Sequence, residues 1–91
     1  MILLMVIACT ALGDRMSCLE LDDFSLCPSE TSQEEAEQRC AGAHLGHLVY
    51  YDSITLELEV NAEFYLGDDW WYREGCYGRC DDYTPFICEM N

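Results

Sequence analysis

The chain contains no lysine, and its four arginines stand against 18 aspartates and glutamates, which gives a formal net charge of −14. Such an excess of negative charge repels the phosphate backbone of nucleic acids and the anionic surface of membranes. We therefore expect no nucleic-acid partner. The partners that fit this charge are cationic, neutral or bridged by a divalent cation.

Long apolar runs are also absent. Residues 2–8 form an unbroken apolar run, but a membrane span needs about 20 such residues, so we expect no span. Ala11-Leu12-Gly13 follows as a small-x-small cleavage site and the chain turns polar at Asp14, which is the pattern of a secretory signal peptide. We predict a signal peptide over residues 1–13, secretion to the extracellular space, and one domain over residues 14–91. A buried element of the domain is the alternative, and a lipoprotein signal at Cys9 is another.

Motifs of catalysis are missing as well. The sequence has no Gly-x-Ser-x-Gly, His-Glu-x-x-His or Cys-x-x-Cys, and His44 and His47 are its only imidazoles. Carboxylate pairs are frequent because the composition is acidic, so their spacing is no evidence for acid–base chemistry. We expect a protein that is not an enzyme.

Cysteine, in contrast, is abundant. Cleavage after residue 13 would remove Cys9 and leave an even number of cysteines. Six cysteines in a short secreted chain predict three disulfides, formed among Cys18, Cys27, Cys40, Cys76, Cys80 and Cys88. The alternative is a zinc site of Cys76 and Cys80 with His44 and His47, but zinc needs thiolates and an oxidising compartment removes them.

Local patterns predict a mixed α+β domain. Residues 14–30 suit a hairpin, with a turn at 27–29. Ser32 or Thr31 can cap a helix over residues 31–43, because glutamates stand where a capping box requires them. On that helix Ala36, Cys40 and Ala43 would face the core.

The second half of the chain also contains patterns of both strands and a helix. We predict strands at 46–51 and 83–90, with residues 65–67 a short strand and 68–79 a loop. Residues 53–64 fit both a strand, by alternation, and a helix, by steps of four. We favour the helix, capped by Ser53.

Four motifs occur in a characteristic order. They are Glu34-Glu35-Ala36-Glu37-Gln38-Arg39-Cys40, then Gly46-His47-Leu48-Val49, then Phe64-Tyr65-Leu66-Gly67, and finally Cys80 with Pro85-Phe86-Ile87-Cys88-Glu89. Together they resemble the C-type lectin-like domain over about residues 18–91. The resemblance implies two helices packed on short antiparallel strands. It also implies the bridges Cys40–Cys88, Cys18–Cys27 and Cys76–Cys80, and a secreted module that binds a protein or a glycan.

The sequence departs from that family where the family binds sugar. The region between Gly67 and Cys76, which carries the long loop and the calcium–sugar site in lectin members, is largely missing. Neither Pro28 nor Pro85 lies in a Glu-Pro-Asn or Gln-Pro-Asp motif, and Trp-Asn-Asp is absent. Gln33 also stands where the first helix usually has a tryptophan. We therefore expect no metal at the usual position.

The remaining loop is the candidate ligand site. Its aromatic and basic side chains stand in a row and are flanked by acids; the residues are Trp70, Trp71, Tyr72, Arg73, Asp68, Asp69 and Glu74. Aromatic rings can stack on a sugar while carboxylates accept from its hydroxyls, and Trp, Tyr and Arg anchor protein interfaces. One tryptophan could instead fill the core, the acids could be a solvated rim, and Asp68 with Asp69 could hold calcium weakly. The pair Asp81-Asp82 fits a turn better than a site.

Three functions remain open. The leading hypothesis is a C-type lectin-like module without enzymatic activity that binds a carbohydrate or a protein. The others are an acidic matrix or mineral-associated protein that collects calcium diffusely, and a truncated lectin without function. The oligomeric state is left open by the sequence.

Overall fold

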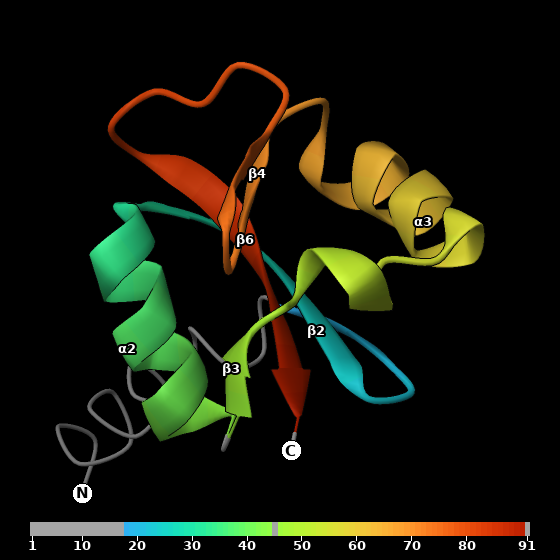
Figure 1. Cartoon of the computed structure of the whole chain (residues 1–91), viewed down its shortest axis with the longest axis horizontal. Helices are drawn as coiled ribbons and strands as arrows, with labels where there is room; N and C mark the ends of the chain where they lie inside the picture. The colour runs from blue at the N-terminus through green and yellow to red at the C-terminus, as the bar shows by residue number, and fades with distance from the viewer. Residues whose placement is uncertain (1–17, 45, 91) are drawn as a thin grey trace, which may run out of the picture.

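A six-stranded sheet with a helix on each face forms the body of the protein (Figure 1). The computed structural model describes residues 18–44 and 46–90, so the predicted signal peptide and Cys9 lie outside the described residues. The elements in chain order are β1 (Leu19–Leu21), β2 (Phe24–Thr31), α2 (Gln33–Ala43), β3 (Gly46–Leu48), the 3-10 turn η1 (Tyr51–Ser53), α3 (Leu56–Leu66), β4 (Trp70–Tyr72), β5 (Gly75–Tyr77) and β6 (Thr84–Met90). This mixture of helices and strands confirms the predicted α+β class.

Strand β6 lies at the centre of the sheet. It pairs antiparallel with β2 and with β3, and parallel with β4, which gives the strand order β1-β2-β6-β4-β5. The predicted closing strand over residues 83–90 is therefore confirmed. The predicted strand over 46–51 is shorter than expected, because only Gly46–Leu48 pair with β6. Gly46 is required there, since a side chain would collide with the Glu89 backbone.

The predicted N-terminal hairpin is present, but the predicted turn at 27–29 is wrong. β1 and β2 pair antiparallel around the turn at Asp22 and Asp23. Pro28 lies inside β2, where the register with β6 shifts between Cys27 and Thr31. Proline has no N–H for the ladder, and an irregularity of this kind tolerates it.

Helix α2 begins at the predicted cap. The Ser32 hydroxyl accepts a hydrogen bond from the Glu35 N–H at 3.2 Å, and Ala36 and Cys40 are buried against the sheet. Ala43 is exposed, so the predicted core stripe ends one turn early. Its position in the last turn of α2 carries it past the edge of the contact.

Helix α3 begins later and ends later than predicted. Thr55, not Ser53, is the cap, and its hydroxyl accepts from the Leu58 N–H at 3.1 Å. The helix continues to Leu66 and ends at Gly67, whose φ of 100° is readily adopted only by glycine. The predicted strand over 65–67 is therefore wrong, because these residues complete and cap the helix.

The predicted loop over residues 68–79 is also wrong, because it contains a hairpin. β4 and β5 pair antiparallel, and Arg73 and Glu74 form the turn between them. Aromatic residues favour strands, and β4 gains a second partner because Trp71 pairs with Phe86 of β6.

Two hydrophobic cores lie on the two faces of the sheet. The core under α3 contains Leu26, Val49, Leu58, Ala62, Trp70 and Ile87. The core under α2 contains Cys27, Ala36, Cys40, Leu48, Phe86 and Cys88. Neighbouring residues of β2 and β6 enter opposite cores, as side-chain alternation along a strand requires.

The three disulfides are those that the resemblance implies, namely Cys18–Cys27, Cys40–Cys88 and Cys76–Cys80. The bridge between Cys40 and Cys88 joins α2 to the central strand. No helix within residues 18–44 and 46–90 is long and apolar enough to cross a membrane.

Candidate functional site

The hairpin β4–β5 carries most of the side chains that the sequence suggests for ligand binding. Successive residues of β4 point to opposite sides of the strand, so the hairpin separates Trp70 from Trp71. The predicted site is therefore divided among different surfaces, and only part of it meets solvent.

Trp70 belongs to the core and not to a binding surface. Its side chain is fully buried, and its ring stacks on Tyr77 with the centroids 4.3 Å apart and the planes within 3° of parallel. Its indole nitrogen has no hydrogen-bond partner among the described residues. The expectation that one tryptophan fills the core is confirmed, and Trp70 is removed from the candidate ligand site for that reason.

Two of the predicted acids hold the backbone in place. One Asp69 carboxylate oxygen accepts from the Arg79 N–H at 2.6 Å, and one Glu74 oxygen accepts from the Tyr51 N–H at 2.9 Å. Asp68 is exposed beside Asp69. The acids at the start of β4 and in its turn therefore have local structural roles that do not depend on a ligand.

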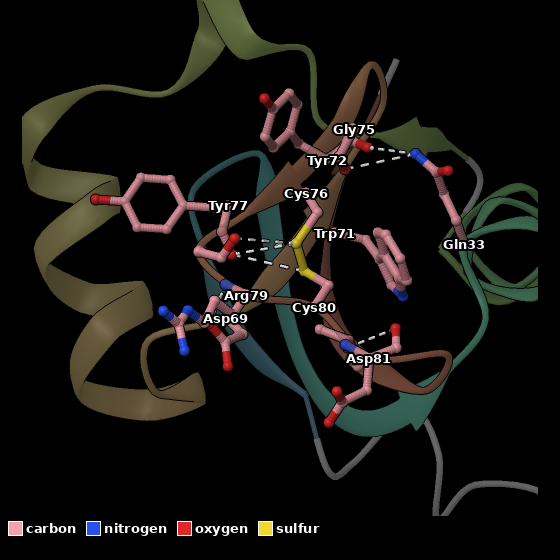
Figure 2. The surroundings of a disulfide bond; sticks show 12 residues. Gln33, Asp69, Trp71, Tyr72, Gly75, Cys76, Tyr77, Arg79, Cys80 and Asp81 are labelled. Atoms are coloured by element: carbon pink, nitrogen blue, oxygen red, sulfur yellow. Dashed lines mark hydrogen bonds between the residues drawn. A yellow bond between two sulfur atoms is a disulfide. The ribbon is translucent and has the colours of Figure 1, made fainter.

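Arg73 faces α2, whereas the Tyr72 side chain packs against the core under α3 and its backbone carbonyl faces α2. Arg73 forms an ion pair with Glu37 and lies 5.6 Å from the centre of the Tyr50 ring. Gln33 donates to the Tyr72 and Gly75 carbonyls at 3.2 and 3.4 Å (Figure 2), so Gln33 holds the hairpin onto α2. An open hollow of about 590 Å³ lies here, but a ligand would have to compete with Glu37 for the guanidinium.

Trp71 lies on another surface. Its ring is half-buried and packs against the core under α2, and its indole N–H donates to the Thr31 carbonyl at 2.8 Å. Figure 2 shows Trp71 and Tyr77 on opposite sides of the hairpin, with Asp81 below the Trp71 ring. The hydrogen bond and the packing fix one face of the indole in a defined orientation.

An open hollow of about 790 Å³ lies beside Trp71. Its lining residues are Glu30, Trp71, Cys80, Asp81, Asp82 and Tyr83, and we call it the Trp71 recess. The Tyr83 side chain is 65% exposed. The recess thus combines two aromatic rings with three carboxylates and contains no basic lining residue. Rings of this kind stack on the apolar face of a sugar or on a cationic group, and carboxylates accept hydrogen bonds from hydroxyls or cations.

Sequence reasoning assigned Asp81 and Asp82 to a turn, and the structure has them there as well. The Asp81 N–H donates to the Thr84 hydroxyl at 3.2 Å, and that hydroxyl lies 3.3 Å from the Asp81 carbonyl. The turn projects Tyr83 outward beside Trp71. The sequence signal for this site is an aromatic residue, Tyr83, preceded by two acids just before the closing strand, but its closeness to Trp71 depends on the pairing of β4 with β6.

One group of metal-ligating residues lies close together within the described part of the chain, namely Cys18, Cys27 and His44. The His44 Nε2 atom is 3.7 Å from each sulfur, but the two cysteines form a disulfide and so offer no thiolate. The alternative zinc site is wrong in its grouping, because Cys76 and Cys80 are bonded to each other and His44 lies beside the other pair. Asp68 and Asp69 are not part of any such group among residues 18–44 and 46–90.

No family model, curated protein or solved structure matches the chain. Function must therefore be argued from the site itself.

Proposed function

We propose that the protein is a secreted, non-enzymatic binding module of the C-type lectin-like type, and that it recognises a glycan or a protein through the Trp71 recess. The observation that carries the proposal is the recess itself, where half-buried Trp71 and exposed Tyr83 stand among the carboxylates of Glu30, Asp81 and Asp82. A ligand that suits it has an apolar face for the rings and donor groups for the acids.

Three features support the lectin-like part of the proposal. The protein is a small α+β domain, its three bridges join the cysteines that the resemblance pairs, and one bridge ties the first described helix to the last strand. Disulfides persist in oxidising compartments, which supports secretion.

The proposed recognition does not use calcium. The usual calcium–sugar motifs are absent from the sequence, and a calcium ion takes about six to eight oxygen ligands. In the Trp71 recess the carboxylates accept directly from ligand hydroxyls or from a cationic side chain. Chelator should therefore leave binding unchanged.

The test uses secreted, oxidised protein and immobilised neutral oligosaccharides, with and without EDTA. We expect EDTA-resistant binding that Tyr83→Ala weakens by up to about tenfold, because one aromatic contact contributes about 0.5–1.5 kcal/mol. Asp82→Asn should also weaken binding. Tyr51→Ala is the matched control, since Tyr51 is 59% exposed and does not line the recess.

Three results would count against this function. Binding that requires calcium would point to a site that we have not described. Unchanged binding in both Tyr83→Ala and Asp82→Asn would move the ligand away from the recess. Absence of sugar binding together with many weak, salt-sensitive calcium sites would favour the acidic matrix role.

A further inference from the structure

Helix α3 presents an apolar stripe to solvent. Leu56, Val60 and Phe64 are 76%, 58% and 94% exposed. Residues four apart lie on one face of a helix, so the three side chains form a continuous line, which we call the α3 stripe. Leu58 and Ala62 occupy the opposite, buried face. Large apolar side chains in such an arrangement mark an interaction surface more often than scattered exposed residues do.

A hollow of about 220 Å³ lies beside the stripe, between α3 and the β1–β2 hairpin. Leu21, Phe24 and Leu58 give it apolar walls, and Asp22 and Glu57 place carboxylates on its lining. A lysine or arginine side chain has the matching chemistry, because its aliphatic stem packs on apolar surface while its charged head meets acids. The hollow and the stripe adjoin on α3, because Glu57 and Asn61, which line the hollow, stand three residues before Val60 and Phe64, and residues three apart are neighbours on a helix surface.

The charged side chains of α3 itself are all negative. Helix α3 contains three glutamates and no arginine or lysine. With about 100° of rotation per residue, Glu57 and Glu63 fall on the two sides of the stripe. Two copies of α3 packed face to face would bring these carboxylates together, which disfavours a homodimer. A basic partner would instead place cations against them.

We propose that the α3 stripe and the adjoining hollow dock a cationic amphipathic segment of another protein. Its apolar side chains pack on Leu56, Val60 and Phe64, and one of its lysines or arginines enters the hollow between Asp22 and Glu57. This is the helix-in-groove type of recognition. The stripe belongs to the helix on the other face of the sheet from α2, so it is separate from the Trp71 recess and does not depend on the function proposed for it (Figure 1).

The test uses the secreted, oxidised protein and a labelled helical peptide of leucine and lysine with its leucines on one face. A peptide of the same composition in scrambled order, and one with glutamine in place of lysine, are the matched ligands. By fluorescence anisotropy the amphipathic cationic peptide should bind at least about tenfold more tightly than either of them. A factor of ten corresponds to about 1.4 kcal/mol.

Substitutions in the protein test where the peptide binds. The double substitution Val60→Ser and Phe64→Ser should lower affinity at least about tenfold without unfolding the protein, because both side chains are exposed. Asp22→Asn with Glu57→Gln should also lower affinity, and asparagine tolerates the positive φ of 51° at position 22. Glu34→Gln with Glu35→Gln removes the same charge from α2 and should leave binding unchanged.

Each alternative explanation predicts a different result, and each of these results would overturn the proposal. Equal losses from the two pairs of acid substitutions would mean diffuse electrostatic attraction. A dimer in sedimentation equilibrium that Val60→Ser and Phe64→Ser dissociate would mean that a second copy covers the stripe. Peptide binding by protein that lacks residues 1–13, but not by protein produced with them retained, would mean that the chain's own apolar segment covers it.

Discussion

The two helices of the protein begin in the same way and present opposite chemistry to solvent. α2 and α3 each contain 11 residues, each is capped by a hydroxyl that accepts from an N–H three residues later, and each buries two side chains. The outer face of α2 exposes Glu34, Glu35 and Gln38, whereas that of α3 exposes the stripe of Leu56, Val60 and Phe64. The buried face explains why each helix sits on the sheet. The exposed face of α2 is polar and suits water, whereas that of α3 is apolar and is the surface that we propose docks a partner.

The cores under the helices differ as well. The core under α2 contains three half-cystines and is tied together by Cys40–Cys88. The core under α3 contains no cysteine, and its largest member is Trp70, stacked on Tyr77. One core therefore contains a covalent cross-link between helix and sheet, and the other is centred on a stacked aromatic pair. Three measurements test this difference.

The largest effect should come from the aromatic core. Trp70→Ala should cost about 3–5 kcal/mol in the free energy of unfolding, because it leaves a large cavity under α3. Trp71→Ala should cost less, since Trp71 is only half-buried. Urea unfolding followed by circular dichroism measures both. Trp70→Phe is a useful control, because it keeps a ring against Tyr77 and removes an indole N–H that lacks a partner among the described residues. Equal losses from Trp70→Ala and Trp71→Ala would contradict the assignment of Trp70 alone to the core.

The second-largest loss of stability should come from removing the disulfide in the core under α2. Replacing both Cys40 and Cys88 by alanine should cost about 2–5 kcal/mol. Replacing Cys76 and Cys80 should cost about 2 kcal/mol less in the chain-entropy account, because their bridge spans a separation of 4 residues and the other spans 48. Thermal and urea unfolding of the two double variants measure the difference. Similar stabilities for both would show that loop closure is not how Cys40–Cys88 stabilises the fold.

The smallest effect should be a pH dependence of folding stability that arises on the α3 side of the sheet. The Tyr77 hydroxyl donates to the Glu59 carboxylate, and this bond, with desolvation and the charges of Glu59 and Glu63, raises the pKa of Tyr77 from 10.0 to about 12. The folded state thus holds this proton more tightly than the unfolded state. The contribution to stability is complete below about pH 10 and is lost as the pH rises towards 12.

Absorbance at 295 nm should show that Tyr77 ionises well above pH 10, and the melting temperature should fall over the same pH range. Tyr77→Phe is the control, because it keeps the ring on Trp70 and removes the titrating group. A Tyr77→Phe protein with the same alkaline fall in melting temperature as the wild type would rule out this residue as its cause.

Local signals predicted the parts of the fold that depend on neighbours in the sequence. Ser32 and the glutamates after it placed the start of α2, and the order of cysteine motifs implied all three bridges. The second helix was harder, because Ile54, Leu58 and Ala62 have the same spacing as Leu56, Val60 and Phe64. Spacing shows that two stripes exist, but only packing against Leu26 and Ile87 decides which of them is buried.

The candidate site was less predictable for the same reason. The sequence indicated that one of two adjacent tryptophans would fill the core, and it could not say which. That choice depends on the pairing of Trp71 with Phe86, a contact between distant parts of the chain. The same pairing brings the half-buried face of Trp71 towards Asp81, Asp82 and Tyr83, which local rules assign only to a turn.

The central position of β6 has a consequence for how the protein is made. β6 follows all the other elements in the chain, and it is a pairing partner of β2, β3 and β4. In a chain entering an oxidising compartment as it is synthesised, Cys18 and Cys27 can bond early, while Cys40 waits for a partner 48 residues later. At about 5–20 residues per second, that wait is about 2–10 s. During that time the Cys40 thiol can bond with Cys18 or Cys27, and with Cys76 or Cys80 once these have been synthesised, so the yield of correctly bridged protein should depend on disulfide isomerisation in the cell that produces it.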